Sequence, residues 1–180
     1  MADAVQAFVK FTPSNAQFGQ FSKGESRHKD YPASKGFIEV KGLDWTIAAE
    51  TSFSDGGGAS VGQPTTEALS FKHAYDLAGC QLQGYIAAGL HFDEVLFYVC
   101  KAVGKEGTLP YLTVKLKTAF VTEANISLGN DGKLDQEVKM VFKKIDIKYI
   151  MQAETGTLDG GESNLIWEVQ GNEPIVITAK

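Results

Sequence analysis

The motif with the clearest potential for chemistry is Gly58-Ala59-Ser60-Val61-Gly62, which matches the G-x-S-x-G pattern of serine hydrolases. In those enzymes the serine lies on a strained turn between an apolar strand and a helix, where it attacks an acyl carbon. Here Asp55-Gly56-Gly57 precedes the motif and Gln63-Pro64 follows it, so neither flanking element is predicted. A small β-barrel serine hydrolase that uses Ser60 therefore remains an alternative and not the favoured reading.

The histidines and cysteines do not follow a metal-ligand pattern. His28, His73 and His91 are far apart in the sequence, and Cys80 and Cys100 lie in apolar surroundings without CxxC or Cys/His spacing. We expect buried, reduced thiols, and we predict no catalytic residue, metal or cofactor. A monomeric barrel that binds a small ligand is a further alternative, although 11 Phe, 6 Tyr and 2 Trp favour a filled interior.

The composition narrows the class of protein. A chain of 180 residues, 43% of them hydrophobic, can fill one core, so we expect a single domain over residues 1–180. The formal net charge of -5 offers no broad basic surface for nucleic acid. The longest apolar run, Val95 to Cys100, is strand-sized, so no membrane insertion is expected. No signal peptide is readable at the N-terminus, so we expect folding in the cytoplasm.

Alternation of apolar and polar residues predicts a chain made mostly of β-strands. The pattern occurs at residues 43–49, 69–73, 112–116 and 165–169, and further strands are predicted at 5–11, 37–40, 120–128 and 175–178. The segment from Glu94 to Val103 is apolar on both faces, which indicates a central strand covered on each side or one whose outer face a partner buries. Long loops are expected at residues 12–35 and 52–66.

The apolar face of the segment 137–153 changes sides near Lys143 and Lys144. Apolar residues occupy even positions before this point and odd positions after it: Val138, Met140 and Phe142, then Ile145, Ile147, Tyr149 and Met151. A bulge or bend that carries one long strand from one sheet to another would produce this change. Asn130-Asp131-Gly132, just upstream, predicts a hairpin turn.

One helix is predicted from Leu77 to Ala88. Asp76 is placed as its N-cap and Gly89 as its left-handed C-terminal stop. Its apolar residues Ala78, Leu82, Tyr85 and Ile86 follow helical spacing. The expected fold class is therefore all-β with one helix.

Several short motifs occur in an order that spans most of the chain. They are Gly24-Glu25-Ser26, His28-Lys29-Asp30, Phe37-Ile38-Glu39-Val40, Leu43-Asp44-Trp45, the helix from Asp76 to Gly89, His91-Phe92-Asp93-Glu94-Val95, and the segment from Phe142 to Tyr149. This order resembles that of the haemolysin-coregulated protein (Hcp) family, the tube subunits of the type VI secretion system. Two departures are a longer first loop, at residues 12–22 and again at 31–35, and Gly79-Cys80, where the family often has serine and proline.

The resemblance implies a two-sheet antiparallel β-barrel with a single flanking α-helix, assembled as a hexameric ring. In such a ring each subunit offers one edge to a different edge of its neighbour, a heterologous contact, and the closed rings stack into a hollow tube. The implied partners are further copies of the chain, a contractile sheath, a tip spike protein and small effector cargo in the lumen. The protein would then be secreted through the type VI system without a signal peptide.

The resemblance also implies that an extended loop reaches onto an adjacent subunit, here at residues 51–66. Glycine suits such a contact because it permits close backbone approach. The residues predicted to form the subunit interface are Asp55, Gly56, Gly57, Gly58, Ser60, Gly62, Thr65 and Thr66.

Overall fold

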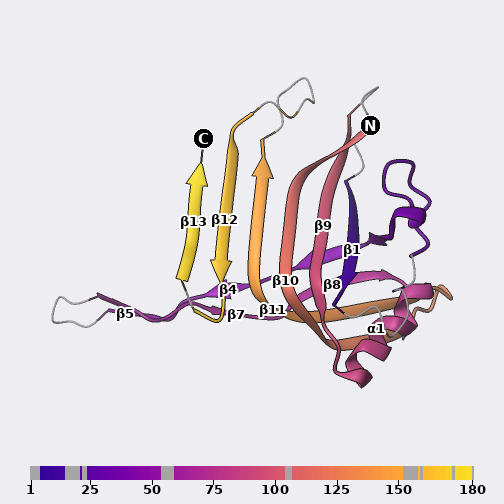
Figure 1. Ribbon diagram of the computed structural model, residues 1–180, viewed down its shortest axis with the longest axis horizontal. Helices are drawn as coiled ribbons and strands as arrows, with labels where there is room; N and C mark the ends of the chain where they lie inside the picture. Colours follow the sequence, from indigo (N-terminus) through magenta and orange to yellow (C-terminus); the bar gives the residue numbers. More distant parts are fainter. Residues whose placement is uncertain are drawn as a thin grey trace.

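The computed structural model describes residues 5–14, 21, 24–53, 59–103, 107–151, 158, 160–171 and 173–179 (Figure 1). The elements are β1 (Gln6–Pro13), η2 (Ala33–Lys35), β2 (Phe37–Val40), β3 (Gly42–Asp44), β4 (Ile47–Ala48), β5 (Thr51–Phe53), β6 (Ala59–Val61), β7 (Thr65–Thr66), β8 (Leu69–Ala74), α1 (Leu77–Ala88), β9 (Phe92–Val103), β10 (Gly107–Leu128), β11 (Leu134–Ile150), β12 (Glu162–Glu168) and β13 (Glu173–Ala179). The predicted class, β-strands with one α-helix, is confirmed.

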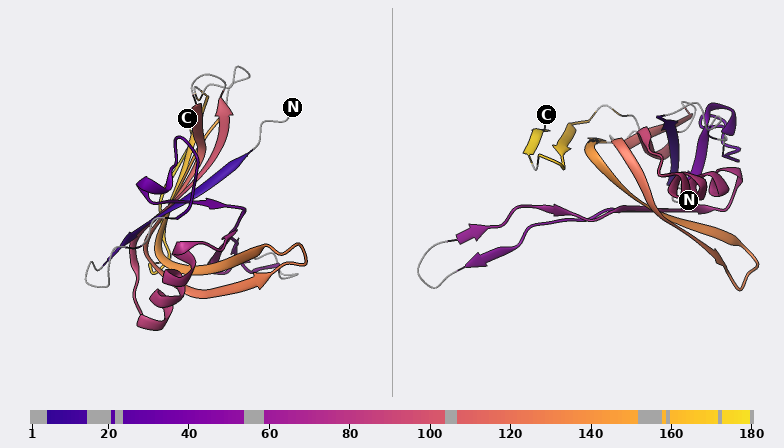
Figure 2. Two further views of the ribbon diagram at one scale, coloured as in Figure 1. Left: turned by 90° about the vertical axis from the view of Figure 1, so that its right-hand side faces the viewer. Right: turned by 60° about the horizontal axis from the view of Figure 1, so that its bottom comes forward.

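The main sheet is antiparallel and runs in the order β2-β1-β9-β10-β11-β12-β13. The first half of β11 also pairs with β8, and β8 pairs with β3. Because Lys41 N donates to Lys72 O at 2.7 Å, the chain between β2 and β3 joins the sheet to β8 and closes the barrel. The hairpin of β10 and β11 therefore belongs to both layers, the upright sheet and the layer beneath it (Figures 1 and 2).

The change of face near Lys143 is confirmed, and it belongs to three strands at once. Buried positions shift by one residue at aligned points: from Phe92 to Val95 in β9, from Leu116 to Ala119 in β10, and from Phe142 to Ile145 in β11. We call the line through Asp93, Thr118 and Lys143 the crease. β10 and β11 keep one register across it, so it is a shared bend and not an extra residue in β11. Both layers thereby point their apolar side chains into one core.

The helix is confirmed with the predicted bounds and caps. Ala78 N donates to Asp76 Oδ1 at 3.0 Å, and Gly89 ends the helix at φ 64°. Its buried face packs on the core beneath the crease, where the rings of Tyr85 and Phe92 stack at 4.3 Å. Ile86 differs from the prediction, because 36% of it is exposed.

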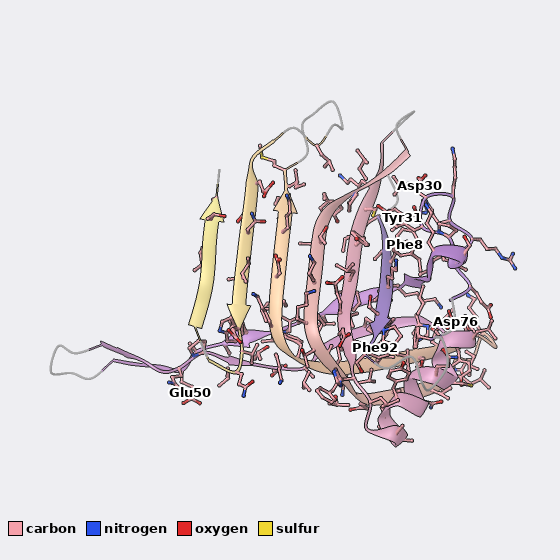
Figure 3. All side chains as sticks on the ribbon, viewed as in Figure 1. Phe8, Asp30, Tyr31, Glu50, Asp76 and Phe92 are labelled. Atoms are coloured by element: carbon pink, nitrogen blue, oxygen red, sulfur yellow. The ribbon has the colours of Figure 1, made fainter. Side chains whose placement is uncertain are left out.

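β9 is a central strand, buried on its core face and covered on its second face only at the end that carries Cys100. Its second face carries the buried Cys100, which lies with Phe8 and Phe37 in a small cluster covered by Tyr31. Tyr31 stacks on Phe8 at 4.5 Å, and the Asp30 carboxylate accepts the backbone N–H of Thr108 at 3.1 Å (Figure 3). The His28-Lys29-Asp30 motif thus clamps a surface loop over the outer face of the sheet.

Three expectations need correction. The strand expected at 43–49 divides at Trp45, because β3 pairs in the barrel while β4 pairs with β7 in a separate ribbon. The loop expected at 52–66 contains strands β5, β6 and β7. Cys80 is exposed and Cys100 alone is buried, both as free thiols, since Cys80 falls on the outer side of α1.

Candidate assembly surfaces

A long two-stranded ribbon, the arm (residues 46–66), leaves the barrel and extends away from it (Figure 2). Its strands form two small sheets, β4 with β7 and β5 with β6, and neither is part of the main sheet. A free two-stranded ribbon is marginally stable in water, because each strand lacks a second neighbour and a covering layer. The main sheet of the same chain gives the described strands of the arm no such second neighbour.

Trp45 fixes the root of the arm. Its ring lies 6.3 Å from that of Phe142 and 6.4 Å from that of Trp167, so it is held at the crease. Its Nε1–H donates to Thr66 Oγ1 at 2.7 Å, on the strand that returns from the arm. Glu67 N donates to Thr46 O at 3.0 Å and closes the root. These contacts couple the direction of the arm to the barrel.

The predicted interface residues are distributed along this arm. Thr66 and Thr65 lie at its root, and the Thr65 hydroxyl donates to Ala48 O at 3.3 Å. Gly62 donates its N–H to Glu50 O at 2.7 Å, and a Cβ at Gly62 would lie 3.0 Å from that same oxygen. Ser60 lies in β6, further out on the arm. Asp55, Gly56, Gly57 and Gly58 lie outside the described residues.

The geometry around Ser60 differs from a nucleophile elbow. Ser60 pairs with Ser52 in the middle of the β5–β6 ribbon, and the next element in the chain is another strand. An elbow needs a sharp turn from a strand into a helix, because the turn exposes the hydroxyl and aims helix N–H groups at the substrate. The backbone here is therefore that of a strand and not of a hydrolase turn.

The histidines lie in three separate places. His73 is fully buried between β8 and β11, where its Nε2–H donates to Gln136 Oε1 at 2.9 Å. His28 Nδ1 accepts the backbone N–H of Asp30 at 3.2 Å within the surface clamp. His91 lies against Phe120 at the crease. Over the part of the chain that the structure describes, no three His, Cys, Asp or Glu side chains are close enough to hold a metal ion.

The face of the sheet that points away from the core is strongly charged. Glu94, Lys117, Lys144 and Glu168 lie side by side across β9, β10, β11 and β12. Lys117 forms an ion pair with Glu94, and Lys148 with Glu162 at 2.8 Å. In the next row Lys115 and Asp146 lie side by side on β10 and β11, so charges of both signs follow the middle of this face. Such a face stays hydrated and suits an aqueous space.

Within the described ranges, no helix has the length and apolar character needed to cross a membrane.

Comparison with protein families gives a match to the model described as "Type VI secretion system effector, Hcp" over residues 8–149. A curated relative, Protein hcp1 of Pseudomonas aeruginosa, is 27% identical over 105 residues, which cover 58% of this chain and 64% of the relative. That match spans less than two thirds of the relative's length.

Solved structures share the fold over almost the whole chain. A structure described as a type six secretion system protein superposes with a TM-score of 0.80 at 19% identity, covering 95% of this chain and 99% of the other. Hcp1 from Salmonella typhimurium superposes with a TM-score of 0.71 at 24% identity, covering 96% and 99%. At these identities the superpositions establish a shared fold.

Proposed function

Because the chain belongs to the Hcp family of type VI secretion system effectors, we propose that it is a structural subunit of the secretion tube and works as a hexameric ring. The observation that supports this most directly is the arm, whose described strands pair with each other and not with the main sheet. A neighbouring copy supplies the cover that the arm lacks on its own barrel. The interface residues of the arm would then be Asp55, Gly56, Gly57, Gly58, Ser60, Gly62, Thr65 and Thr66.

In such a ring the charged face of the sheet would line the lumen. Its lysines and carboxylates keep a wide channel wet, and they offer both signs of charge to small effector cargo. Stacked rings would form the tube within a contractile sheath, behind a tip spike protein. The work of the subunit is then mechanical, and it leaves the cell through the type VI system.

We propose that the chain forms a single domain and that it has no catalytic activity. The position of Ser60 in a β-ribbon favours a structural part for this residue. Ser60→Ala removes one hydroxyl from an interface of many residues, so rings should still form, and no hydrolysis of ester substrates should be lost. An esterase activity of the wild type that disappears in this variant would support the hydrolase alternative.

Electron microscopy and native mass spectrometry of the purified chain test the ring. The expected particle has a mass of about 117 kDa, six times the chain mass of 19.5 kDa, and a central hole. A monomer at every concentration, with no annular particles, would contradict the proposal.

Thr66 tests the part played by the arm. Thr66→Val preserves shape but removes the acceptor of the Trp45 Nε1–H, whereas Thr66→Ser retains the hydroxyl and serves as the matched control. We expect Thr66→Val to speed hydrogen exchange at the backbone N–H of Glu67 and to weaken assembly, with a fold as stable as that of Thr66→Ser to within about 1 kcal/mol. Equal assembly by both variants would show that the direction of the arm does not matter.

A further inference from the structure

One row of apolar side chains crosses all seven strands of the main sheet on its core face. Cross-strand partners share a face, and the register gives the row as Ile38, Val9, Phe97, Val114, Ile147, Leu165 and Ile177. Exposure is 1% at Ile38, 0% at Val9, 1% at Phe97 and 5% at Val114, but it reaches 74% at Ile177. The apolar row therefore continues beyond the layer that the chain itself provides.

The covering layer ends because β8, β3 and α1 lie under one end of the sheet only. Figure 1 shows them at the side of β1, β9 and β10, while β12 and β13 stand beyond them. Ile147 and Leu165 are half-buried and pack against the margin of the core, whereas Ile177 lies beyond the covering layer and is exposed. We call Leu165 and Ile177 the outer sheet patch.

A second set of exposed apolar side chains lies at the opposite end of the molecule. Leu128 and Leu134 face each other at the tip of the β10–β11 hairpin, with exposures of 71% and 40%. Ile126 is 41% exposed and shares their face. Because Tyr75 N donates to Leu134 O at 2.9 Å, the start of α1 lies beside the tip, and its Leu77 is 64% exposed.

These four residues, Leu77, Ile126, Leu128 and Leu134, form the tip patch. The hairpin tip and β13 point to opposite sides of the barrel (Figure 2). Within the strands these patches extend faces that are buried nearby: Ile126 lies two residues from Ala124, the partner of the buried Val138, and Leu165 lies two residues from the buried Trp167. Two apolar patches made of different residues at opposite ends suit head-to-tail contact between copies, which generates a closed ring when the rotation per subunit closes.

We propose that the outer sheet patch of one copy packs against the tip patch of the next copy, and that this contact closes the ring. The inference depends on the ring proposed above and assigns its lateral contact to named residues. The occupant is a second copy because the two patches supply each other's missing apolar cover. No further partner chemistry is needed.

Lysine substitutions separate the two patches. Ile177→Lys places a charge in the outer sheet patch, and Leu128→Lys places one in the tip patch. The matched controls are Thr178→Lys and Ser127→Lys, which put the same charge on the adjacent exposed residue of the same strand, pointing to the other face. All four positions are solvent-exposed on the isolated chain, so thermal unfolding of the four variants should be closely similar.

We expect Ile177→Lys alone and Leu128→Lys alone to lose ring formation completely, while both controls form rings as the wild type does. An equimolar mixture of the two defective variants should form a complex of two chains, about 39 kDa from a chain mass of 19.5 kDa, and stop there. In that complex the intact tip patch of one variant meets the intact outer sheet patch of the other, and both remaining patches are defective.

Rings formed by either defective variant, or a mixture that stays monomeric, would overturn the proposed contact. If the wild type forms rings and these variants do so too, the inference fails while the tube function stands. If the wild type itself forms no rings, the proposed function and the lateral contact both fail.

Discussion

At the scale of single residues, the buried polar groups of this protein hold α1 to the barrel. His73 and Gln136 are both fully buried, and Gln136 Oε1 accepts the Nε2–H of His73 while its Nε2 donates to Gly79 O at 3.3 Å. Gly79 leaves the necessary room, since a Cβ there would lie 2.7 Å from Tyr75 Cε2. This close approach gives a physical reason for glycine at position 79.

Breaking this chain of hydrogen bonds should be costly. Gln136→Met should lower the free energy of unfolding by about 2 kcal/mol, because it leaves the His73 Nε2–H buried without a partner. The double variant His73→Phe/Gln136→Met removes that unpaired N–H and should recover part of the loss. Urea denaturation of the two single variants and the double variant measures the coupling. Strict additivity would contradict the network.

Several tyrosine side chains are buried or half-buried, which predicts that the folded protein loses stability at alkaline pH. Burial, followed by the hydrogen bond with Cys100, raises the pKa of Tyr31 above its ordinary value of 10.0. Burial also raises the pKa of Tyr85, Tyr98 and Tyr111. A raised folded-state pKa means that the unfolded chain loses its proton first, so this stability is fully present below pH 10 and declines as the pH rises beyond it.

We expect the free energy of unfolding to fall steadily above pH 10, and Tyr31→Phe to make that fall shallower. Denaturant titrations at several alkaline pH values, with tyrosinate absorbance followed in parallel, give both slopes. Identical slopes for the wild type and Tyr31→Phe would show that Tyr31 is not a source of the pH dependence.

At the scale of elements, the crease decides how a long hairpin serves two layers. Its middle residue, Thr118, has φ 50°, and it is the only non-glycine residue with positive φ among those described. A β-branched residue resists this conformation, at a cost of about 1–3 kcal/mol. The bend is held in place by the ion pair of Lys117 and Glu94 and by the core side chains on each side of it. The barrel therefore keeps a strained hinge line between its layers.

Asparagine adopts positive φ more readily than threonine, so Thr118→Asn should raise the free energy of unfolding by about 1 kcal/mol. Thr113→Asn is the control in the same strand, where ordinary extended backbone favours threonine and a small loss is expected. Chemical denaturation measures both. A loss of stability in Thr118→Asn similar to that in Thr113→Asn would show that the bend does not strain Thr118.

At the scale of the whole molecule, the barrel is asymmetric. One end of the sheet is covered by its own second layer, the other end is bare and apolar at Ile177, and the arm extends past that bare end (Figure 1). The charged face, in contrast, needs no cover from a second copy, because charged side chains are stable in water. Assembly through apolar ends with a hydrated face left free is the arrangement that a hollow tube requires.

A ring held together by apolar contacts should be insensitive to salt concentration. We expect the ring to persist when sodium chloride is raised from about 0.1 M to about 1 M, because screening weakens exposed charge pairs and not apolar burial. Sedimentation velocity at both concentrations tests this. Dissociation at high salt would indicate that charged pairs hold the subunits together.

Much of this architecture was determined locally, and the sequence therefore reveals it. The helix limits follow from Asp76 and Gly89, and the bend near Lys143 follows from the change of parity between Phe142 and Ile145. Capping and side-chain alternation are effects of neighbouring residues, so a single segment displays them. The family resemblance rested on the order of such segments.

Other features depended on which strands meet. Nothing within residues 43–49 marks Trp45 as the point where the chain leaves the barrel, because that choice follows from the pairing of β3 with β8. The exposure of Cys80 follows from which face of α1 meets the core. The apolar row loses its cover at Ile177 because β8 and α1 do not extend that far beneath the sheet. Alternation states that a face is apolar, but only tertiary structure decides whether the chain itself covers that face or leaves it for a partner.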